Sequence, residues 1–446
     1  MRKLPFIAAM LGMCMTPLLA HAQDAAADLP IDKANTAWVL VSSALVMLMT
    51  PGLAFFYAGM VRRKNVVSTL FKNFAALAVV GVLWTVVGYS LSFAPGSGFV
   101  GDWKTHFMLD NIAVDKGFTL NGSTYTIPEL LYVLFQMMFA IITPALIIGS
   151  LVERINFKAW LIIMAMWSLL VYAPVAHWVW GEGGWIVTQG GLDFAGGLVV
   201  HVCSGVSALV AALIFGRRVT ANEPARPNDV SMVLLGAALL WFGWFGFNAG
   251  SALAADGLAV QAFATTFMAA ATAFLGWMFY DWIVAGKPSA VGSAVGLVAG
   301  LVVITPAAGY VTIPVAMLMG LIGGVVCNFA SRVVKKATRL DDALDVFGCH
   351  GVGGICGAIL TGLFASKSVN PAIPNQGFLI DHTTELLSTN LIATACTIAY
   401  AALMTFVLIK FVGFFIKLRV SEEEESAGLD DSQHGEFARY REQASH

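Results

Sequence analysis

Charged residues are scarce in this chain of 446 residues. Asp, Glu, Lys and Arg make up 12% of it, against about 25% in soluble domains, whereas 58% of the residues are hydrophobic. So little charge excludes a water-soluble globule and a disordered chain, and a formal net charge of -2 leaves no basic surface for nucleic acid. The composition predicts an all-α polytopic membrane protein whose helices are apolar nearly all round.

Cysteine is also scarce, and the six cysteines include no CxxC pair. Cys14 lies in the N-terminal leader, and the others lie in or beside apolar stretches. They are Cys203, Cys327, Cys349, Cys356 and Cys396. We interpret them as small buried hydrophobes rather than a disulfide or metal set, and we expect no metal or other cofactor.

The first 22 residues have the organisation of a secretory signal peptide. Arg2 and Lys3 precede an apolar run that ends in Ala20-His21-Ala22, a small-x-small cleavage site. We therefore predict cleavage before Gln23 and a mature N-terminus outside the cytoplasmic membrane. The alternative is an uncleaved first span.

Long apolar stretches dominate the rest of the chain. About 20 apolar residues cross a bilayer as a helix, and the sequence contains eleven such stretches, of which the eighth is short and glycine-rich. They are residues 36–61, 74–93, 127–151, 159–176, 194–215, 230–253, 260–282, 290–305, 313–330, 346–364 and 391–415. We predict eleven transmembrane helices in one membrane domain, residues 23–419.

Basic residues are distributed unevenly between the two sides of these spans. With the N-terminus outside, only Lys33, Lys104, Lys116 and Lys367 lie in outer segments, while nineteen Lys and Arg lie in inner loops, at the inner end of the last span or in the tail. Inner loops of membrane proteins are enriched in Lys and Arg. The sequence therefore predicts a protein of the cytoplasmic (inner) membrane with its N-terminus outside and its C-terminus inside.

The tail, residues 420–446, is polar and begins with four glutamates, Glu422 to Glu425. Such a segment is either a solvated, mobile end or a docking segment for a cytoplasmic partner.

Matching strings occur in the same order in the two halves of the chain. They are D-x7-H at 193–201 and 342–350, ITPA at 142–145 and 304–307, and F-x-A-G at 56–59 and 247–250. The matches relate spans five apart, and an odd number of spans reverses the second copy in the membrane. We predict an inverted repeat, residues 36–215 and 230–364, followed by one additional span, 391–415; chance similarity of apolar strings is the alternative.

The repeat has a geometric consequence for two histidines. His201 lies eight residues inward from Asp193, a candidate N-cap, and His350 lies eight residues inward from Asp342 on the opposite face of the membrane. Each histidine is then roughly 12 Å deep, so the two meet near the midplane of a hydrocarbon core about 30 Å thick if their helices are neighbours. An intramembrane histidine indicates a functional site, although a structural polar contact or a metal site would also explain the pair.

Aromatic residues gather at the outer ends of several spans. Trp178, Trp180 and Trp185 crowd the loop after the fourth span, where they form either an interfacial aromatic belt or a cation–π site for a small cation. Phe135 and Phe139 lie four residues apart on one helix face and fit either core packing or an apolar plug above the histidines.

These strings together resemble the ammonium transporter family (Amt/MEP/Rh), most closely its bacterial AmtB-like channels, over essentially the whole mature chain. The strings that carry the resemblance are PELLYVLFQMMFA (128–140), AHWVWG (176–181), DFAGGLVVH (193–201), GWFGFNAGSA (243–252), DDALDVFGCHG (341–351) and GLDDSQHGE (428–436). The resemblance implies a non-enzymatic ammonium transporter, a homotrimer with one pore in each subunit, and a cytoplasmic PII-type regulatory protein that blocks the pore.

The resemblance also assigns roles at the outer mouth. It implies substrate recruitment at Trp180, Ser251 and Phe135, and a gate formed by Phe139 and Phe247. Glu182, an additional acid beside Trp180, either raises cation affinity or faces water without effect.

Deeper in the membrane, the resemblance implies twin pore histidines at His201 and His350 and a pore-facing tryptophan at Trp244. Asp193 and Asp342 match the acidic positions that shape the vestibules.

Selectivity then has a simple physical basis. Ammonium and potassium face the same desolvation cost, but only ammonium can give up a proton. We predict that ammonium is recruited at the aromatic site, loses a proton on passing the gate, and crosses as ammonia hydrogen-bonded to the histidines, which also offer a path for the proton. The sequence leaves open whether net charge moves. The alternatives are an ammonium sensor that signals through the tail, a channel for another small neutral solute, and an intramembrane hydrolase, for which we find neither a nucleophile elbow nor HExxH.

Overall fold

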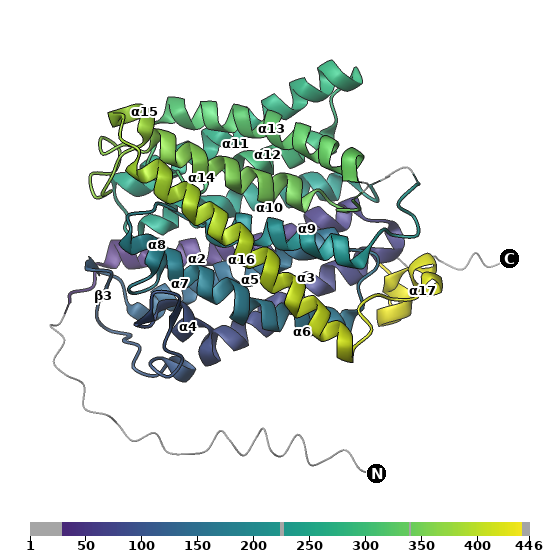
Figure 1. The fold of residues 1–446 in the computed structure, drawn as a ribbon, viewed down its shortest axis with the longest axis horizontal. Helices are drawn as coiled ribbons and strands as arrows, with labels where there is room; N and C mark the ends of the chain where they lie inside the picture. Colours follow the sequence, from purple (N-terminus) through teal and green to yellow (C-terminus); the bar gives the residue numbers. More distant parts are fainter. Residues whose placement is uncertain (1–28, 224–226, 339, 439–446) are drawn as a thin grey trace, which may run out of the picture.

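The computed structural model describes residues 29–223, 227–338 and 340–438 as a bundle of long helices (Figure 1). Among these residues, ten helical segments are long and apolar enough to cross a membrane. An eleventh apolar helix, α12 (Ala290–Ile304), has 15 residues and is shorter than that limit. The predicted signal peptide lies outside the described residues.

Helices in the first half of the chain follow the predicted spans. They are α2 (Lys33–Met60), α3 (Val66–Leu83), η3 (Trp84–Gly88), α4 (Tyr89–Phe93), α5 (Glu129–Leu151), α6 (Phe157–Trp167), η5 (Ser168–Tyr172), α7 (Ala173–Trp180), η6 (Gly197–Val202) and α9 (Cys203–Phe215), with the short η2 (Arg63–Asn65), η4 (Phe107–Leu109) and α8 (Trp185–Thr188) between them.

The second half continues in the same way. Its helices are α10 (Val230–Ala249), η7 (Gly250–Ala252), α11 (Gly257–Ala285), α12, α13 (Ile313–Thr338), η8 (Phe347–Gly351), α14 (Val352–Phe364), α15 (Phe378–Asp381) and α16 (Glu385–Phe415), followed by α17 (Glu422–Ala427) and η9 (Asp430–His434) in the tail. Two small antiparallel hairpins, β1 (Gly96–Ser97) with β2 (Val100–Gly101) and β3 (Phe118–Leu120) with β4 (Ser123–Tyr125), belong to the loop between α4 and α5. In Figure 1, β3 and α15 mark one end of the bundle and α17 marks the other.

The second span begins earlier than predicted, at Arg63 rather than at residue 74. Its first turns contain polar residues that resemble a loop in the sequence, yet Lys72 and Asn73 are buried. The Lys72 ammonium donates to the Ser68 hydroxyl, and the Asn73 amide donates to the Thr69 carbonyl 2.9 Å away. Because the Lys72 ammonium and the Asn73 amide nitrogen each find an acceptor one turn earlier, the helix extends through them.

Close helix contacts rest on glycine at two positions. A Cβ at Gly236 of α10 would come within 2.3 Å of the Phe56 nitrogen of α2, and a Cβ at Gly205 of α9 would come within 2.1 Å of the Gly351 nitrogen. Only glycine permits backbones to approach this closely. The Gly205 contact brings α9 against η8. Helix α9 continues from η6, which contains His201, and η8 contains His350.

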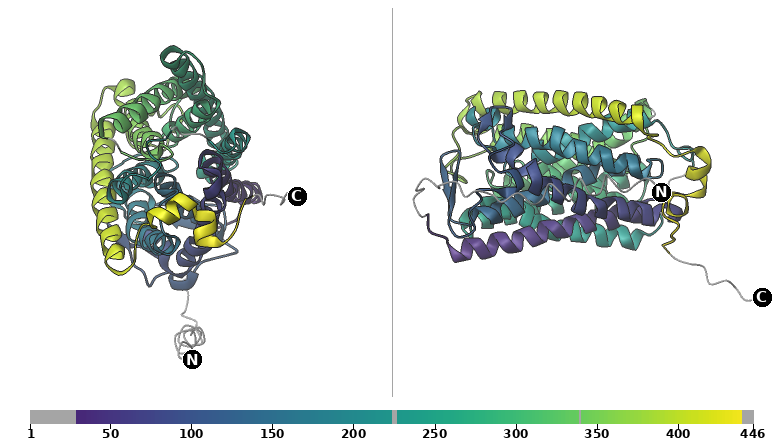
Figure 2. Two further views of the ribbon diagram at one scale, coloured as in Figure 1. Left: turned by 90° about the vertical axis from the view of Figure 1, so that its right-hand side faces the viewer. Right: turned by 90° about the horizontal axis from the view of Figure 1, so that it is seen from below.

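The five cysteines within the described residues are free thiols, but their burial differs from the prediction. Cys203, Cys327 and Cys349 are buried, Cys356 is intermediate and Cys396 is exposed. The prediction of five buried cysteines is therefore wrong for Cys396. It lies on α16, which runs along the outside of the bundle (Figure 2), where an apolar side chain can face lipid instead of protein.

An ion-pair cluster holds the loops at the tail end of the bundle. Arg154 is fully buried and donates to the Asp341 carbonyl 2.7 Å away, while Arg218 makes two bonds of 2.9 Å to the Asp341 carboxylate. Burial lowers the pKa of Arg154 to about 10. Burial also raises the pKa of Asp341, but the hydrogen bonds and charge of Arg218 outweigh it and bring that pKa to about 2. Both groups are therefore charged at neutral pH, and the cluster anchors the segment that leads into η8.

The first part of the tail is folded against the helices, not free in solvent. The buried Glu425 carboxylate accepts from the Val219 nitrogen and from the Arg419 guanidinium, each over 2.6 Å. Asp430 accepts from the Ser68 nitrogen over 2.7 Å, at the N-terminus of α3. Such a carboxylate stabilises a helix N-terminus, so the tail caps a membrane helix more than 300 residues away in the chain.

We expect Glu425→Ala to release this tail. The substitution leaves the Val219 nitrogen and Arg419 without their buried partner, at a cost of about 1–3 kcal/mol. Limited chymotrypsin digestion should then cleave the tail several times faster. Glu422→Ala removes the same charge from an exposed neighbouring position and should leave the rate unchanged; equal rates for the two variants would contradict the anchoring role of Glu425.

Candidate functional site

The two histidines singled out in the sequence meet inside the bundle. His201 and His350 are buried, their Nδ1 atoms lie 3.2 Å apart, and their ring planes are tilted by 26°. At this distance one Nδ1 must carry a hydrogen and the other must accept it. The His201 Nε2 has no hydrogen-bond partner among the described residues, so it remains available to a ligand in the lumen.

Both histidines occupy π-helical turns, which the sequence spacing did not predict. His201 lies in η6 and His350 in η8, and the His201 nitrogen bonds to the Gly196 carbonyl five residues earlier. A π-turn is costly and is found frequently at functional sites. A π-turn occurs at the histidine in each half of the chain, but η3, η5 and η9 are π-helical as well, so a π-turn alone does not identify the site.

Asp193 sets the start of the first of these turns. One carboxylate oxygen accepts from the nitrogens of Gly196 and Gly197 at 2.8 and 2.6 Å, and the other accepts from those of Leu198 and Val199 at 2.7 and 3.4 Å. A helix start has unpaired N–H groups, and a buried carboxylate satisfies them. Asp193 thus acts as a cap for the helix that contains His201.

Asp342 has the equivalent place in the second half of the chain. Its carboxylate accepts from the Phe347 nitrogen, the first residue of η8, over 2.8 Å.

The lumen beside the histidines is narrow and apolar. Its lining residues are Met49, Leu53, Phe56, Ile142, Leu146, Val200, Leu240, Trp244, Phe247 and Val298, together with the two histidines. It leaves about 10 Å³ for the centre of a water-sized molecule, which is close to the minimum for one small molecule. A hydrated ion does not fit in this space.

Trp244 packs directly on the first histidine. Its ring lies 5.4 Å from that of His201 at 21°, and its indole nitrogen donates to the Thr305 hydroxyl over 2.9 Å. Because this hydrogen bond holds the indole in place, Trp244 presents an aromatic face to the imidazole.

Two phenylalanine rings close the lumen on the side that faces the β3 end of the bundle. Phe139 and Phe247 are stacked with centroids 4.2 Å apart at 27°, and both are buried. Phe135 packs edge-on against Phe139 at 5.0 Å, and Trp180 does so at 6.1 Å. The four rings form a continuous aromatic layer between the lumen and the surface.

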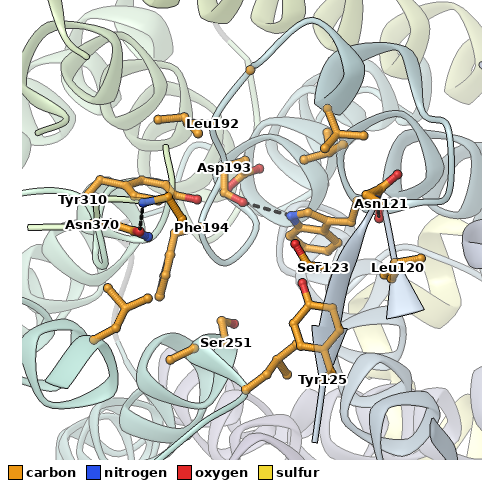
Figure 3. Close-up of a pocket in the computed structure, with 18 of the residues that line it drawn as sticks. Leu120, Asn121, Ser123, Tyr125, Leu192, Asp193, Phe194, Ser251, Tyr310 and Asn370 are labelled. Carbon is orange, nitrogen blue, oxygen red and sulfur yellow. Dashed lines mark hydrogen bonds between the residues drawn. The ribbon is translucent and has the colours of Figure 1, made fainter. Parts of the chain in front are cut away.

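A cavity of about 440 Å³ opens above this aromatic layer, at the β3 end of the bundle (Figure 3). Figure 3 shows Ser251, Asp193, Tyr310 and Tyr125 on different sides of its open centre. Phe135 and Trp180 also line this cavity, whereas Trp178 and Trp185 do not. The structure therefore brings the three predicted recruitment residues to one cavity.

The polar groups in the cavity are oriented by hydrogen bonds. The Trp180 indole nitrogen donates to the Asp193 carbonyl over 2.9 Å, and the Ser251 hydroxyl donates to the Phe247 carbonyl over 2.8 Å. With its hydrogen already used, the Ser251 oxygen can only accept from a ligand. An indole face and a hydroxyl acceptor suit a small cation that carries N–H donors.

The Glu182 carboxylate is engaged in a hydrogen bond with a neighbouring loop. It accepts from the Asn121 nitrogen over 2.6 Å. Asn121 in turn donates to the carbonyls of Trp180 and Gly181 at 3.0 and 3.1 Å and accepts from the Gly183 nitrogen at 3.0 Å. Asn121 thus supports the loop that holds Trp180, a role the sequence analysis missed; the only signal for it was the Asn-Gly turn at 121–122.

Comparison with known proteins bears on this arrangement. The model of the Ammonium Transporter Family matches residues 37–439. The chain is 47% identical to an ammonium transporter of Bacillus subtilis over 91% of this chain and 98% of that one, and 46% identical to an ammonium transporter of Aquifex aeolicus over 98% and 99%. The chain belongs to the ammonium transporter family.

Solved structures agree with this assignment. Mep2 from Saccharomyces cerevisiae superposes with a TM-score of 0.80 at 37% identity, covering 88% of this chain and 91% of that one. A structure named Sensor Amt Protein superposes with a TM-score of 0.81 at 26% identity, covering 90% and 98%. Family membership and the long apolar helices together identify this chain as a multi-pass membrane transporter.

For this transporter we expect Trp180→Leu to weaken capture of ammonium. Loss of a cation–π contact worth about 0.5–2 kcal/mol should raise the half-saturating ammonium concentration roughly 2- to 30-fold, with a smaller change in maximal flux. Flux measured over a range of concentrations in proteoliposomes checks this. Trp103→Leu, at an exposed tryptophan in the loop between α4 and α5, is the matched control; an unchanged half-saturation for Trp180→Leu would contradict recruitment by the indole.

Proposed function

We propose that the protein transports ammonium by recruiting the cation, removing a proton and passing ammonia through the narrow lumen. The observation that carries this proposal is the order of the environments that a molecule meets on one path from the cavity into the lumen. A polar aromatic cavity leads to stacked phenylalanines, and these lead to an apolar lumen whose polar groups are two imidazoles.

Recruitment is assigned to Trp180, Ser251 and Phe135. The cavity contains an indole face, a hydroxyl oxygen that can only accept, and aromatic edges and faces, all at the outer mouth. These groups bind a cation with N–H donors better than they bind potassium, which donates no hydrogen bonds.

Deprotonation is assigned to passage of the gate formed by Phe139 and Phe247. The stacked rings exclude water, and the lumen below them has too little room for a hydration shell. A bare cation would bear a large desolvation cost there, whereas ammonia is neutral. Potassium has no neutral form and is therefore rejected.

Passage is assigned to His201 and His350. Because the two Nδ1 atoms share one hydrogen, one neutral ring has an unprotonated Nε2 and the other a protonated Nε2, so ammonia can donate to the first and accept from the second. The same hydrogen-bonded pair offers a route for the proton, because each imidazole can accept at one nitrogen and release at the other.

Several features of the assembly and its membrane context belong to the same proposal. We place the protein in the cytoplasmic (inner) membrane after removal of residues 1–22, with the mature N-terminus outside, the C-terminus inside and α12 completing eleven spans. The basic residues of the loops and the paired D-x7-H strings support this orientation and the inverted repeat. Family membership supports a homotrimer and a cytoplasmic PII-type partner.

Uptake of labelled methylammonium into proteoliposomes tests transport. Purified protein should give uptake that exceeds that of protein-free vesicles and saturates with concentration. No uptake would contradict the proposal. A flux of ammonia that is independent of the pH gradient would instead favour a channel for neutral solutes.

A second candidate function is ammonium sensing. Two observations favour it, the tail that is docked on α3 and the likeness to the structure named Sensor Amt Protein. The same uptake assay separates the two functions, because a pure sensor binds ammonium without moving it across the membrane.

A further inference from the structure

A groove lies on the outer surface of the bundle between α9 and α16, near the end at which the tail docks. Its volume is about 600 Å³, and its walls include Val210 and Leu213 from α9 and Ala402, Leu403 and Phe406 from α16. Figure 2 shows α16 along the outside of the bundle. Leu213 and Leu403 are each more than 60% exposed, so this surface faces the lipid of the membrane and not the protein core.

One charged residue, Lys410, also lines the groove. It is the only basic residue of the 31-residue helix α16 and is exposed. Among the described residues, no carboxylate forms an ion pair with it, and its ammonium lies 5.7 Å from the centre of the Phe406 ring. A lysine on a membrane helix is costly without a partner for its charge.

The depth of Lys410 indicates the nature of that partner. Lys410 lies five residues before the end of α16, which is roughly 7.5 Å at 1.5 Å per residue. A lysine side chain at this depth extends toward the headgroup layer while its methylene stem stays against apolar surface. The groove therefore combines apolar walls with the positive charge of Lys410, which lies at the depth of the lipid phosphates.

We propose that this groove binds one anionic phospholipid from the leaflet on the C-terminal side of the membrane. An acyl chain lies along the apolar walls, and the phosphate pairs with Lys410. Charge complementarity favours this occupant over the same surface of a second copy of the chain, because α9 has no acidic residue and the only one of α16, Glu385, lies at the opposite end of that helix from Lys410.

The groove lies against a junction that also supports the pore. Behind it, Thr405 of α16 donates to Ser207 of α9 over 2.8 Å, and the Trp167 indole of α6 donates to both hydroxyls over 3.1 Å. The helix α9 continues directly from η6, which contains His201. A lipid in the groove bridges α9 and α16 and should therefore stabilise the helix that holds the first pore histidine.

Titration of the purified full-length protein with phosphatidylglycerol tests the proposal. Native mass spectrometry should count one lipid per chain whose occupancy falls on Lys410→Gln, and the apparent melting temperature should rise with phosphatidylglycerol more than with phosphatidylcholine that has the same acyl chains. We expect Lys410→Gln to weaken phosphatidylglycerol binding about fivefold and Lys410→Arg to retain it. Ala402→Leu, which fills the groove without changing charge, should also weaken binding.

Lys417→Gln is the matched control, since Lys417 is an exposed lysine at the same end of α16 that does not line the groove. Equal losses for Lys410→Gln and Lys417→Gln would show general surface attraction and overturn the site. Equal binding of glycerol 3-phosphate would show an anion site without an acyl chain. A change of oligomeric state in Lys410→Gln with unchanged lipid binding would make the groove an interface between copies, which also overturns the proposal.

Discussion

Replacement of both predicted pore histidines, His201→Ala with His350→Ala, is expected to reduce ammonium flux by at least about thirtyfold. In the proposed mechanism each imidazole supplies hydrogen-bonding groups to ammonia, and the other residues that line the lumen are almost all apolar. An unmade hydrogen bond in such a place costs about 1–3 kcal/mol, or roughly 5- to 160-fold for each histidine. Flux measured in proteoliposomes at equal protein content checks this.

The same double variant also reports on selectivity. Without the imidazoles the lumen has room for water in place of the rings, so we expect ammonium to lose its advantage over potassium. His382→Asn is the matched control, because His382 is exposed in the loop between α15 and α16 with a φ of 61°, which asparagine tolerates. Complete, unaltered rejection of potassium by the double variant, at an unaltered ammonium flux, would contradict the role of the histidine pair.

Asp193→Ala is expected to destabilise the protein by about 3–5 kcal/mol. The substitution removes a buried carboxylate that accepts from four backbone nitrogens at the start of η6, and nothing of similar reach replaces it. The four N–H groups would then be left in a site that water reaches poorly. A large drop in apparent melting temperature, with low yield of folded protein, is the measured outcome.

Two related variants make this prediction specific. Asp193→Asn keeps one acceptor oxygen and should lose about half as much stability. Asp256→Ala removes an exposed cap that accepts from two nitrogens at the start of α11, and it should cost only about 1 kcal/mol. Equal melting temperatures for Asp193→Ala and Asp256→Ala would show that burial of the Asp193 cap has no special importance.

The sequence predicted the placement of the histidine pair because the spacing of D-x7-H is a local property. A capped helix start and a rise of about 1.5 Å per residue give depth without any knowledge of neighbours. The lateral meeting of His201 and His350 required one more fact, the close approach of α9 to η8. Gly205 and Gly351 permit that approach, but many other glycines in the chain would have permitted different ones.

Features that depend on non-local partners were not predictable in the same way. The π-turns at both histidines have no signature in residue type, since they arise from how each capped segment fits against its neighbours. The stacking of Phe139 on Phe247 joins α5 to α10, and an aromatic stripe alone is equally typical of core packing. The order of the tail was likewise hidden, because Asp430 finds its partner at the start of a helix far away in the sequence.

Electrical recording from the reconstituted protein, with ammonium, methylammonium and potassium gradients compared at equal size, tests the central claim most directly. The claim is that the path admits only a cation that can lose a proton before it enters the dry lumen. The account predicts transport of ammonium and methylammonium and no potassium current above that of protein-free membranes. A potassium current equal to that carried by ammonium would mean that whole cations pass, and it would contradict deprotonation at the gate.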